Sequence, residues 1–134
     1  MKAILYVSRS VMHGPHAEQD VRRLAEAARE RNRALRVTGA LIFTGDHFAQ
    51  YLEGPAAAVD AVMASIMRDA RHRSIASFEQ EVAWRRFADW DLAFSGQSSF
   101  VDRQVRALFT RPDRLDLKQA REELIELLTV FATS

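Results

Sequence analysis

Hydrophobic residues follow two different periods along this chain, and the changes between them outline the expected elements. Residues 3–8 alternate so that Tyr6 and Ser8 share one face, and both faces are mostly apolar, which predicts a central strand. Residues 17–32 carry apolar side chains at helical spacing, which predicts an amphipathic helix that ends near Asn32.

The next stretch predicts a hairpin and a second helix. Two apolar runs, 37–44 and 47–53, are joined by a short link that contains Gly45, which suits a hairpin turn. Gly54-Pro55 then ends the second strand. A helix is expected to follow directly, because proline is well tolerated in the first turn of a helix.

Two more strand-like runs and a helical tail complete the pattern. Segments 74–84 and 90–95 have strand character, and helical spacing returns from residue 98, with a break at Arg111-Pro112-Asp113. The order is β-α-β-β-α-β-β followed by C-terminal helices, which is an α+β, ferredoxin-like arrangement. Right-handed crossovers place both central helices on one face of the sheet, so they border a slot, and the tail is left to cover the other face. The stripe expected on the tail consists of Leu117, Ala120, Leu124, Leu127, Leu128 and Phe131.

Length and composition narrow the class of protein. The chain has 134 residues, of which 48% are hydrophobic and 28% charged, as in an ordinary single globular domain. Nineteen basic against eighteen acidic residues give a net charge of +1, which predicts neither nucleic acid nor a membrane surface as the partner. There is no cysteine, which excludes disulfides and thiol chemistry. No apolar run approaches the ~20 residues of a membrane span, and the first residues do not form a signal peptide, so a cytoplasmic location is expected.

Two polar side chains stand out because they fall on apolar strand faces. They are Tyr6 and Gln50, and an unpaired hydroxyl or amide there costs about 1–3 kcal/mol. The simple interpretation is that they hydrogen-bond to each other or to nearby backbone. The functional interpretation is that both, with Asn32, point into the slot, which Ile66 lines. A mostly apolar cavity with a few polar anchors is the usual form of a small-molecule site, and a flat ring with polar atoms along one edge suits it.

Other chemistry has little support in the sequence. Asn32 also fits the role of a helix-ending residue. No metal is expected, because the histidines lack the spacing of metal ligands, and neither a phosphate loop nor a nucleophile elbow is present. The histidines are His13, His16, His47 and His72.

With these residues in place, the sequence resembles a BLUF domain, a blue-light sensor that uses a flavin. The resemblance implies a photosensor domain over residues 1–96 and a C-terminal helical extension over 97–134, which packs on the sheet or contacts a partner. It extends over about residues 2–95, and its segments are Leu5-Tyr6-Val7-Ser8, Asn32 with Val37-Thr38-Gly39-Ala40-Leu41, Phe48-Ala49-Gln50-Tyr51-Leu52-Glu53-Gly54-Pro55, Asp69-Ala70-Arg71-His72 and Arg86-Phe87-Ala88-Asp89-Trp90.

The resemblance implies roles for individual residues. Tyr6, Asn32 and Gln50 would contact the edge of a flavin held without a covalent bond, and the cofactor would be FAD, with FMN and riboflavin left open. Ser8 and Trp90 would order the cluster around Tyr6 and Gln50.

The resemblance also implies four further cofactor contacts, which rest on weaker matches to the family motifs. They are Arg31, Ile66, Arg71 and Leu92. Arg71 would reach the pyrimidine side of the ring. Arg31 stands where relatives often carry histidine or asparagine. Leu92 stands where the family usually has methionine, which leads us to expect altered dark recovery or tryptophan placement and no loss of binding.

The mechanism implied is a light-driven transfer of an electron and then a proton from Tyr6. The Gln50 amide then rotates or tautomerises and strengthens its bond to a flavin carbonyl, and the cofactor ends chemically unchanged. No substrate is turned over, so the chain is not expected to be an enzyme. The signal would pass to an unidentified separate protein or through changed self-association, and a homo-oligomer is expected.

Two other functions stay open at this point. The first is a ferredoxin-like protein-interaction module that has lost light sensing, which would purify without colour. The second is a small enzyme of acylphosphatase-like topology, which needs an anion-binding loop after the first strand. Arg9 is the one candidate there, and the following Met12-His13-Gly14-Pro15 lacks the glycine-rich character of such a loop, so this function ranks last.

Overall fold

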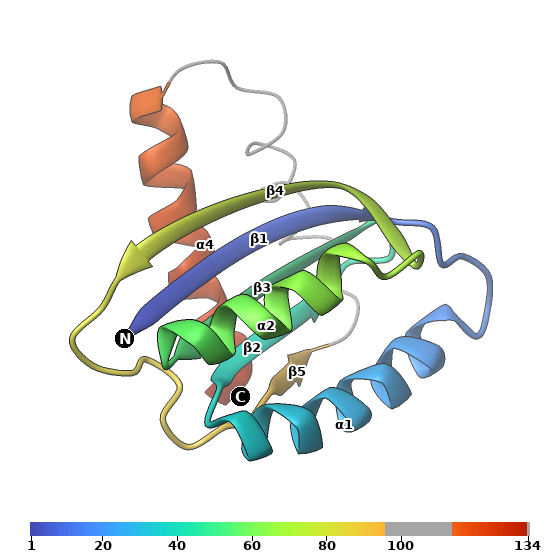
Figure 1. Cartoon of the computed structure of the whole chain (residues 1–134). Helices are drawn as coiled ribbons and strands as arrows, with labels where there is room; N and C mark the ends of the chain where they lie inside the picture. Colours follow the sequence, from blue (N-terminus) through green and yellow to red (C-terminus); the bar gives the residue numbers. More distant parts are fainter. Residues whose placement is uncertain (96–113, 134) are drawn as a thin grey trace.

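The computed structural model of the chain describes residues 1–95 and 114–133 (Figure 1). The predicted α+β order β-α-β-β-α-β-β is confirmed, with a helix after it. The elements are β1 (Lys2–Ser10), α1 (Ala17–Leu35), β2 (Thr38–Phe43), β3 (His47–Gly54), α2 (Ala56–Met67), β4 (His72–Glu81), β5 (Ala93–Ser95) and α4 (Arg114–Thr133).

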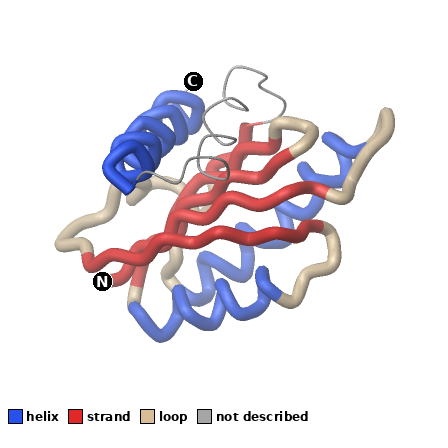
Figure 2. The backbone as a smooth tube through the Cα atoms, turned by 90° about the horizontal axis from the view of Figure 1, so that it is seen from above, coloured by secondary structure: helices blue, strands red, loops and turns tan. Residues whose placement is uncertain are grey.

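One five-stranded sheet organises the fold, in the order β4-β1-β3-β2-β5. β1 lies between β3 and β4 and pairs antiparallel with both, as expected for a central strand, while the short β5 pairs parallel with β2. Figures 1 and 2 show α1 and α2 on one face of the sheet and α4 on the other. Both crossover helices therefore share a face, as predicted.

The alternation of β1 divides its side chains between two cores. Ile4 and Tyr6 belong to the core under α1 and α2. Leu5 and Val7 belong to the core under α4. The strand therefore presents one series of residues to the slot and the other to the C-terminal helix.

The C-terminal helix packs on the sheet through part of the expected stripe. Leu124 and Leu128 are fully buried, Leu127 is only half-buried, and Ile125, which the stripe omitted, is buried. The side chains of Leu117, Ala120 and Phe131 lie outside the described part, as do residues 96–113, so the domain boundary at residue 96 stays a prediction. Among the described helices, none has both the length and the apolar character needed to cross a bilayer.

The first helix extends beyond its predicted end. It continues to Leu35, and Arg36 adopts a left-handed conformation with φ 59°. The N–H groups of Arg36 and Val37 donate to the carbonyls of Arg33 and Asn32, which closes the helix end. The prediction that Asn32 ends the helix is therefore wrong, and Asn32 lies fully buried inside the last turn.

The last strand of the motif is shorter than predicted, because it begins at Ala93 and not at Trp90. The carbonyl groups just before it are bonded to α1 side chains instead of a strand ladder: Arg29 Nε donates to Leu92 O at 2.7 Å and Asn32 Nδ2 donates to Asp91 O at 2.9 Å. Smaller shifts affect β4, predicted over 74–84 and observed over His72–Glu81, and α2, which starts one residue after Pro55.

Tyr51 presents a phenol to the core under α4. Its ring packs against Phe87 at 5.5 Å and the residue is 1% exposed. Its hydroxyl makes no well-formed hydrogen bond in the described part of the chain, although the Gln80 and Arg86 side chains approach it. We expect Tyr51→Phe to change the free energy of unfolding by no more than about 1 kcal/mol, because the hydroxyl that it removes makes only weak polar contacts. Urea unfolding with an unchanged slope checks this, and a loss above that size would contradict it.

Candidate functional site

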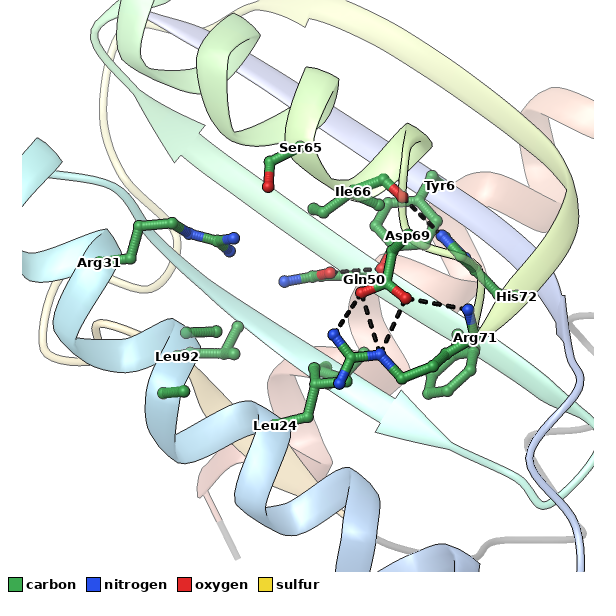
Figure 3. Close-up of a pocket in the computed structure, with 14 residues that line it drawn as sticks. Tyr6, Leu24, Arg31, Gln50, Ser65, Ile66, Asp69, Arg71, His72 and Leu92 are labelled. Atoms are coloured by element: carbon green, nitrogen blue, oxygen red, sulfur yellow. Dashed lines mark hydrogen bonds and ion pairs between the residues drawn. The ribbon is translucent and has the colours of Figure 1, made fainter.

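A cavity of about 210 Å³ lies on the face of the sheet covered by α1 and α2. Its floor comes from β1, β2 and β3, one wall from a single face of α1, and the other from the end of α2 and the turn after it. The lining is mostly apolar, and its polar groups lie on the floor, at the end that holds Asp69 and Arg71, and away from that end at Arg31 and Ser65 (Figure 3). Of the nine predicted site residues, six line it: Tyr6, Arg31, Gln50, Ile66, Arg71 and Leu92.

A buried hydrogen bond joins the two polar residues of the floor. Tyr6 and Gln50 are direct cross-strand partners between β1 and β3, and each is 4% exposed. The Tyr6 hydroxyl donates to Gln50 Oε1 at 2.5 Å. The Gln50 amide nitrogen then faces the cavity (Figure 3). The two side chains bond to each other, as the simple interpretation expected, and the Gln50 amide keeps donor capacity toward the cavity.

Burial keeps the Tyr6 phenol protonated. Desolvation raises the pKa of Tyr6 far above its ordinary value, the nearby Asp69 carboxylate raises it further, and the Arg31 guanidinium opposes both. The hydroxyl therefore stays a donor to Gln50 over the whole neutral and mildly basic range.

Ser8 acts on this pair through a histidine. Ser8 Oγ lies 2.7 Å from His72 Nδ1, and His72 Nε2 lies 2.7 Å from the carbonyl of Ile66. Because a carbonyl only accepts, Nε2 carries the hydrogen, and in the neutral ring Nδ1 accepts from Ser8. The His72 ring stands edge-on to Tyr6 at 5.9 Å and to Phe48 at 6.0 Å. His72 therefore connects Ser8 to the face of the sheet on which the phenol lies, and no role was predicted for it from the sequence.

Three predicted site residues do not line the cavity: Ser8, which bonds to His72 as described above, Asn32 and Trp90. Asn32 is fully buried, and its amide is bonded to the carbonyl of Asp91. Trp90 packs against the core under α4, on the other side of the sheet, while Leu92 from the same segment lies in the cavity. The placement of Trp90 beside Leu92 that a regular strand would give is therefore wrong for this structure, since residues 90–92 make no strand ladder.

An ion pair closes one end of the cavity. Arg71 Nε and Nη2 bind the Asp69 carboxylate at 2.8 Å and 2.5 Å, and the Arg71 N–H donates to it at 2.9 Å. These bonds to Arg71 lower the pKa of Asp69, so the carboxylate keeps its charge. Asp69 lines the cavity but was not selected as a site residue from the sequence. It binds Arg71, the arginine that was predicted to contact the ligand.

Arg31 differs from Arg71 because no carboxylate meets it. The residue is half-buried, its Nε has no hydrogen-bond partner among the described residues, and Nη2 lies 3.5 Å from Asn32 Oδ1. Together with apolar walls and the Tyr6–Gln50 floor, this unpartnered donor suits a flat ring that has polar atoms at its edge. The residues present therefore fit a flavin.

A buried carboxylate holds the segment that leads to Leu92. Glu53, at the end of β3, is fully buried and accepts the N–H groups of Arg86 and Phe87, each at 2.7 Å, and the Thr38 hydroxyl at 2.9 Å. Arg85 adds bonds to the Thr38 hydroxyl and to the backbone carbonyl of Glu53. Residues 85–87 are thereby fixed to β2 and β3. In the described part of the chain, no group of three or more potential ligands could hold a metal ion.

The matches to known proteins fall on the part of the chain that builds the cavity. The family model BLUF, described as sensors of blue-light using FAD, matches residues 1–93. The chain is 35% identical over 69 residues to the blue light- and temperature-regulated antirepressor BluF of Escherichia coli K12, covering 52% of this chain and 17% of that protein. It is 29% identical over 102 residues to photoactivated adenylate cyclase subunit beta of Euglena gracilis, covering 75% and 12%. The match spans less than a fifth of either relative.

Solved structures show the same architecture. BlrB, a BLUF protein in its dark state, superposes with a TM-score of 0.74 at 29% identity, with 99% of this chain and 96% of BlrB covered. The photo-activated state of BlsA gives a TM-score of 0.77 at 21% identity, with 97% and 96% covered. The likeness to BlsA concerns the fold alone.

Proposed function

We propose a function from the premise that the chain belongs to the BLUF family of blue-light sensors that use FAD. The cavity between α1 and α2 binds FAD without a covalent bond, and blue light changes the hydrogen bonds of Gln50. The observation that carries this proposal is the buried bond from Tyr6 to Gln50 Oε1 on the cavity floor, with the amide nitrogen facing the ligand space.

Each side chain at the cavity has its own role in this mechanism. FAD, when bound, supplies the absorption of blue light and an excited state that withdraws an electron. Tyr6 is the donor, because its phenol is the buried oxidisable group bonded to the cavity floor, and its proton leaves Oη toward Gln50 Oε1. Gln50 then rotates or tautomerises, which exchanges donor and acceptor atoms on its cavity side. The electron and a proton return to Tyr6, so the phenol is restored and no net oxidation remains. Apolar walls such as Leu92 and Ile66 keep water from the exchange.

The output is proposed to leave the cavity through the segment before β5. This segment, residues 85–92, has Leu92 in the cavity and Phe87 and Trp90 on the α4 side of the sheet. A change in the hydrogen bonds around Gln50 would therefore shift the positions of side chains on both faces. We propose that the chain turns over no substrate and signals to a separate protein. This chain covers 96% of BlrB, whereas it covers 17% of the named antirepressor and 12% of the named cyclase subunit.

The experiment that tests this function is the visible absorption spectrum of the protein, loaded with FAD, in darkness and directly after blue illumination. We expect a flavin band that moves slightly to the red and returns in darkness. A bound flavin whose band never moves would contradict the Tyr6–Gln50 mechanism. A protein that stays colourless after FAD is added would favour the interaction module.

A further inference from the structure

The charges that line the cavity do not balance. Among the described lining residues, Asp69 and Arg71 neutralise each other through the bonds given above. Arg31 remains, and its closest polar contact is the 3.5 Å approach to the uncharged Asn32 amide. The described lining therefore carries one surplus positive charge.

The position of Arg31 gives this charge a direct effect on the cavity. Its Nε is buried, and desolvation lowers the pKa of the guanidinium, although arginine keeps its charge at any ordinary pH. A charge in such a half-dry site interacts more strongly than one in water. Its field reaches the floor, since the guanidinium opposes the rise of the Tyr6 pKa, and Figure 3 shows its side chain extending from α1 toward the Gln50 amide.

The neighbouring Arg33 shows what a solvated arginine of the same helix looks like. Its side chain is 73% exposed, and Nε binds the Asp91 carboxylate at 2.8 Å. Arg31 lacks that exposure and binds no carboxylate directly, since the Asp69 carboxylate that acts on it is already bonded to Arg71, so solvation of a surface charge does not explain its place. A ligand with developing negative charge would supply the missing partner.

We propose that Arg31 tunes the charge of the bound ring: it stabilises the electron-rich, anionic form of the flavin relative to the neutral oxidised form. The inference rests on the proposed function, and it adds a residue that determines how readily the cofactor accepts electrons. It also predicts that this chain differs from relatives with an uncharged residue at the same position.

The test is the two-electron midpoint potential of bound FAD, measured at pH 8 by dye equilibration for the wild type, Arg31→Gln and Arg31→His. The potential, relative to free FAD, reports the ratio of affinities for reduced and oxidised cofactor. We expect both neutral variants to lose about tenfold in that ratio, which corresponds to a potential about 30 mV lower. Arg31→Lys should keep most of the effect because it retains the charge.

The matched control is Arg23→Gln, which removes one positive charge from an exposed position of α1 outside the cavity lining. We expect its ratio to stay within about twofold of the wild type, since exposed charges are screened. The proposal is overturned if the Arg31 variants match this control. It is also overturned if they weaken oxidised and reduced FAD equally, because Arg31 would then bind the cofactor without regard to ring charge. Failure of the wild type to bind FAD at all would instead contradict the proposed function on which the inference rests.

Discussion

Tyr6→Phe is expected to bind FAD and to show no light-induced change in its absorption spectrum. The substitution keeps the ring that packs edge-on against His72 and removes the hydroxyl that donates to Gln50 Oε1. Without that hydroxyl there is neither a phenol to oxidise nor a proton to deliver to the amide. The measurement is the difference spectrum before and after blue light, taken on samples with equal flavin content.

The control for this variant is Tyr51→Phe, which removes the other tyrosine hydroxyl of the chain from the opposite face of β3. Tyr51 does not line the cavity, so its variant should keep the full spectral shift. A Tyr6→Phe protein whose flavin band still moves in blue light and returns in darkness would contradict the proposed role of Tyr6. The lost bond also leaves Gln50 Oε1 without its donor, so stability should fall by about 1–3 kcal/mol.

The largest loss of stability is expected for Glu53→Gln, at about 3 kcal/mol. The carboxylate accepts two backbone N–H groups and one hydroxyl in a site closed to water. An amide of nearly the same shape brings an NH₂ group against these donors, so at least one buried N–H loses its acceptor. Urea unfolding followed by circular dichroism measures the difference.

Glu79→Gln is the matched control for this change. Glu79 lies on β4 with a side chain that is 58% exposed, and its ion pair with Lys2 is 3.5 Å long. Exposed pairs of this kind contribute about 0–1 kcal/mol, so the control should stay close to the wild type. Equal stability of the two variants would show that Glu53 does not hold the 85–87 segment in the way described.

The sequence predicted best what depends on local periodicity. The alternation along β1 placed Tyr6 toward the slot and Leu5 away from it, and the same reasoning brought Gln50 to the facing position of β3. These placements follow from the two-residue period of a strand and need no knowledge of distant contacts.

The features that the sequence did not predict depend on partners far along the chain. Asn32 was expected to end a helix or meet the ligand, and its amide instead bonds to a carbonyl 59 positions away. Trp90 was expected on a strand, but hydrogen bonds from α1 hold the carbonyls that follow it, and the ring lies on the other face. Glu53 carried a weak signal, since a carboxylate at the end of a mostly apolar strand needs buried donors, yet nothing in the pattern identified Arg86 and Phe87 as their source.

The attachment of residues 85–92 at both ends limits how the length of this protein can vary. Glu53 fixes the start of the segment and Arg29 fixes its end, while Trp90 and Leu92 lie on opposite sides of the sheet between these points. One inserted or deleted residue there would move Trp90 or Leu92 out of the position it holds against the C-terminal helix or in the cavity. The loop at residues 11–16 is attached at its start, where the Val11 N–H donates to the Arg71 carbonyl, but residues 13–16 are exposed. Insertions during divergence are therefore expected to accumulate at 13–16 and to be removed by selection from the segment beside β5.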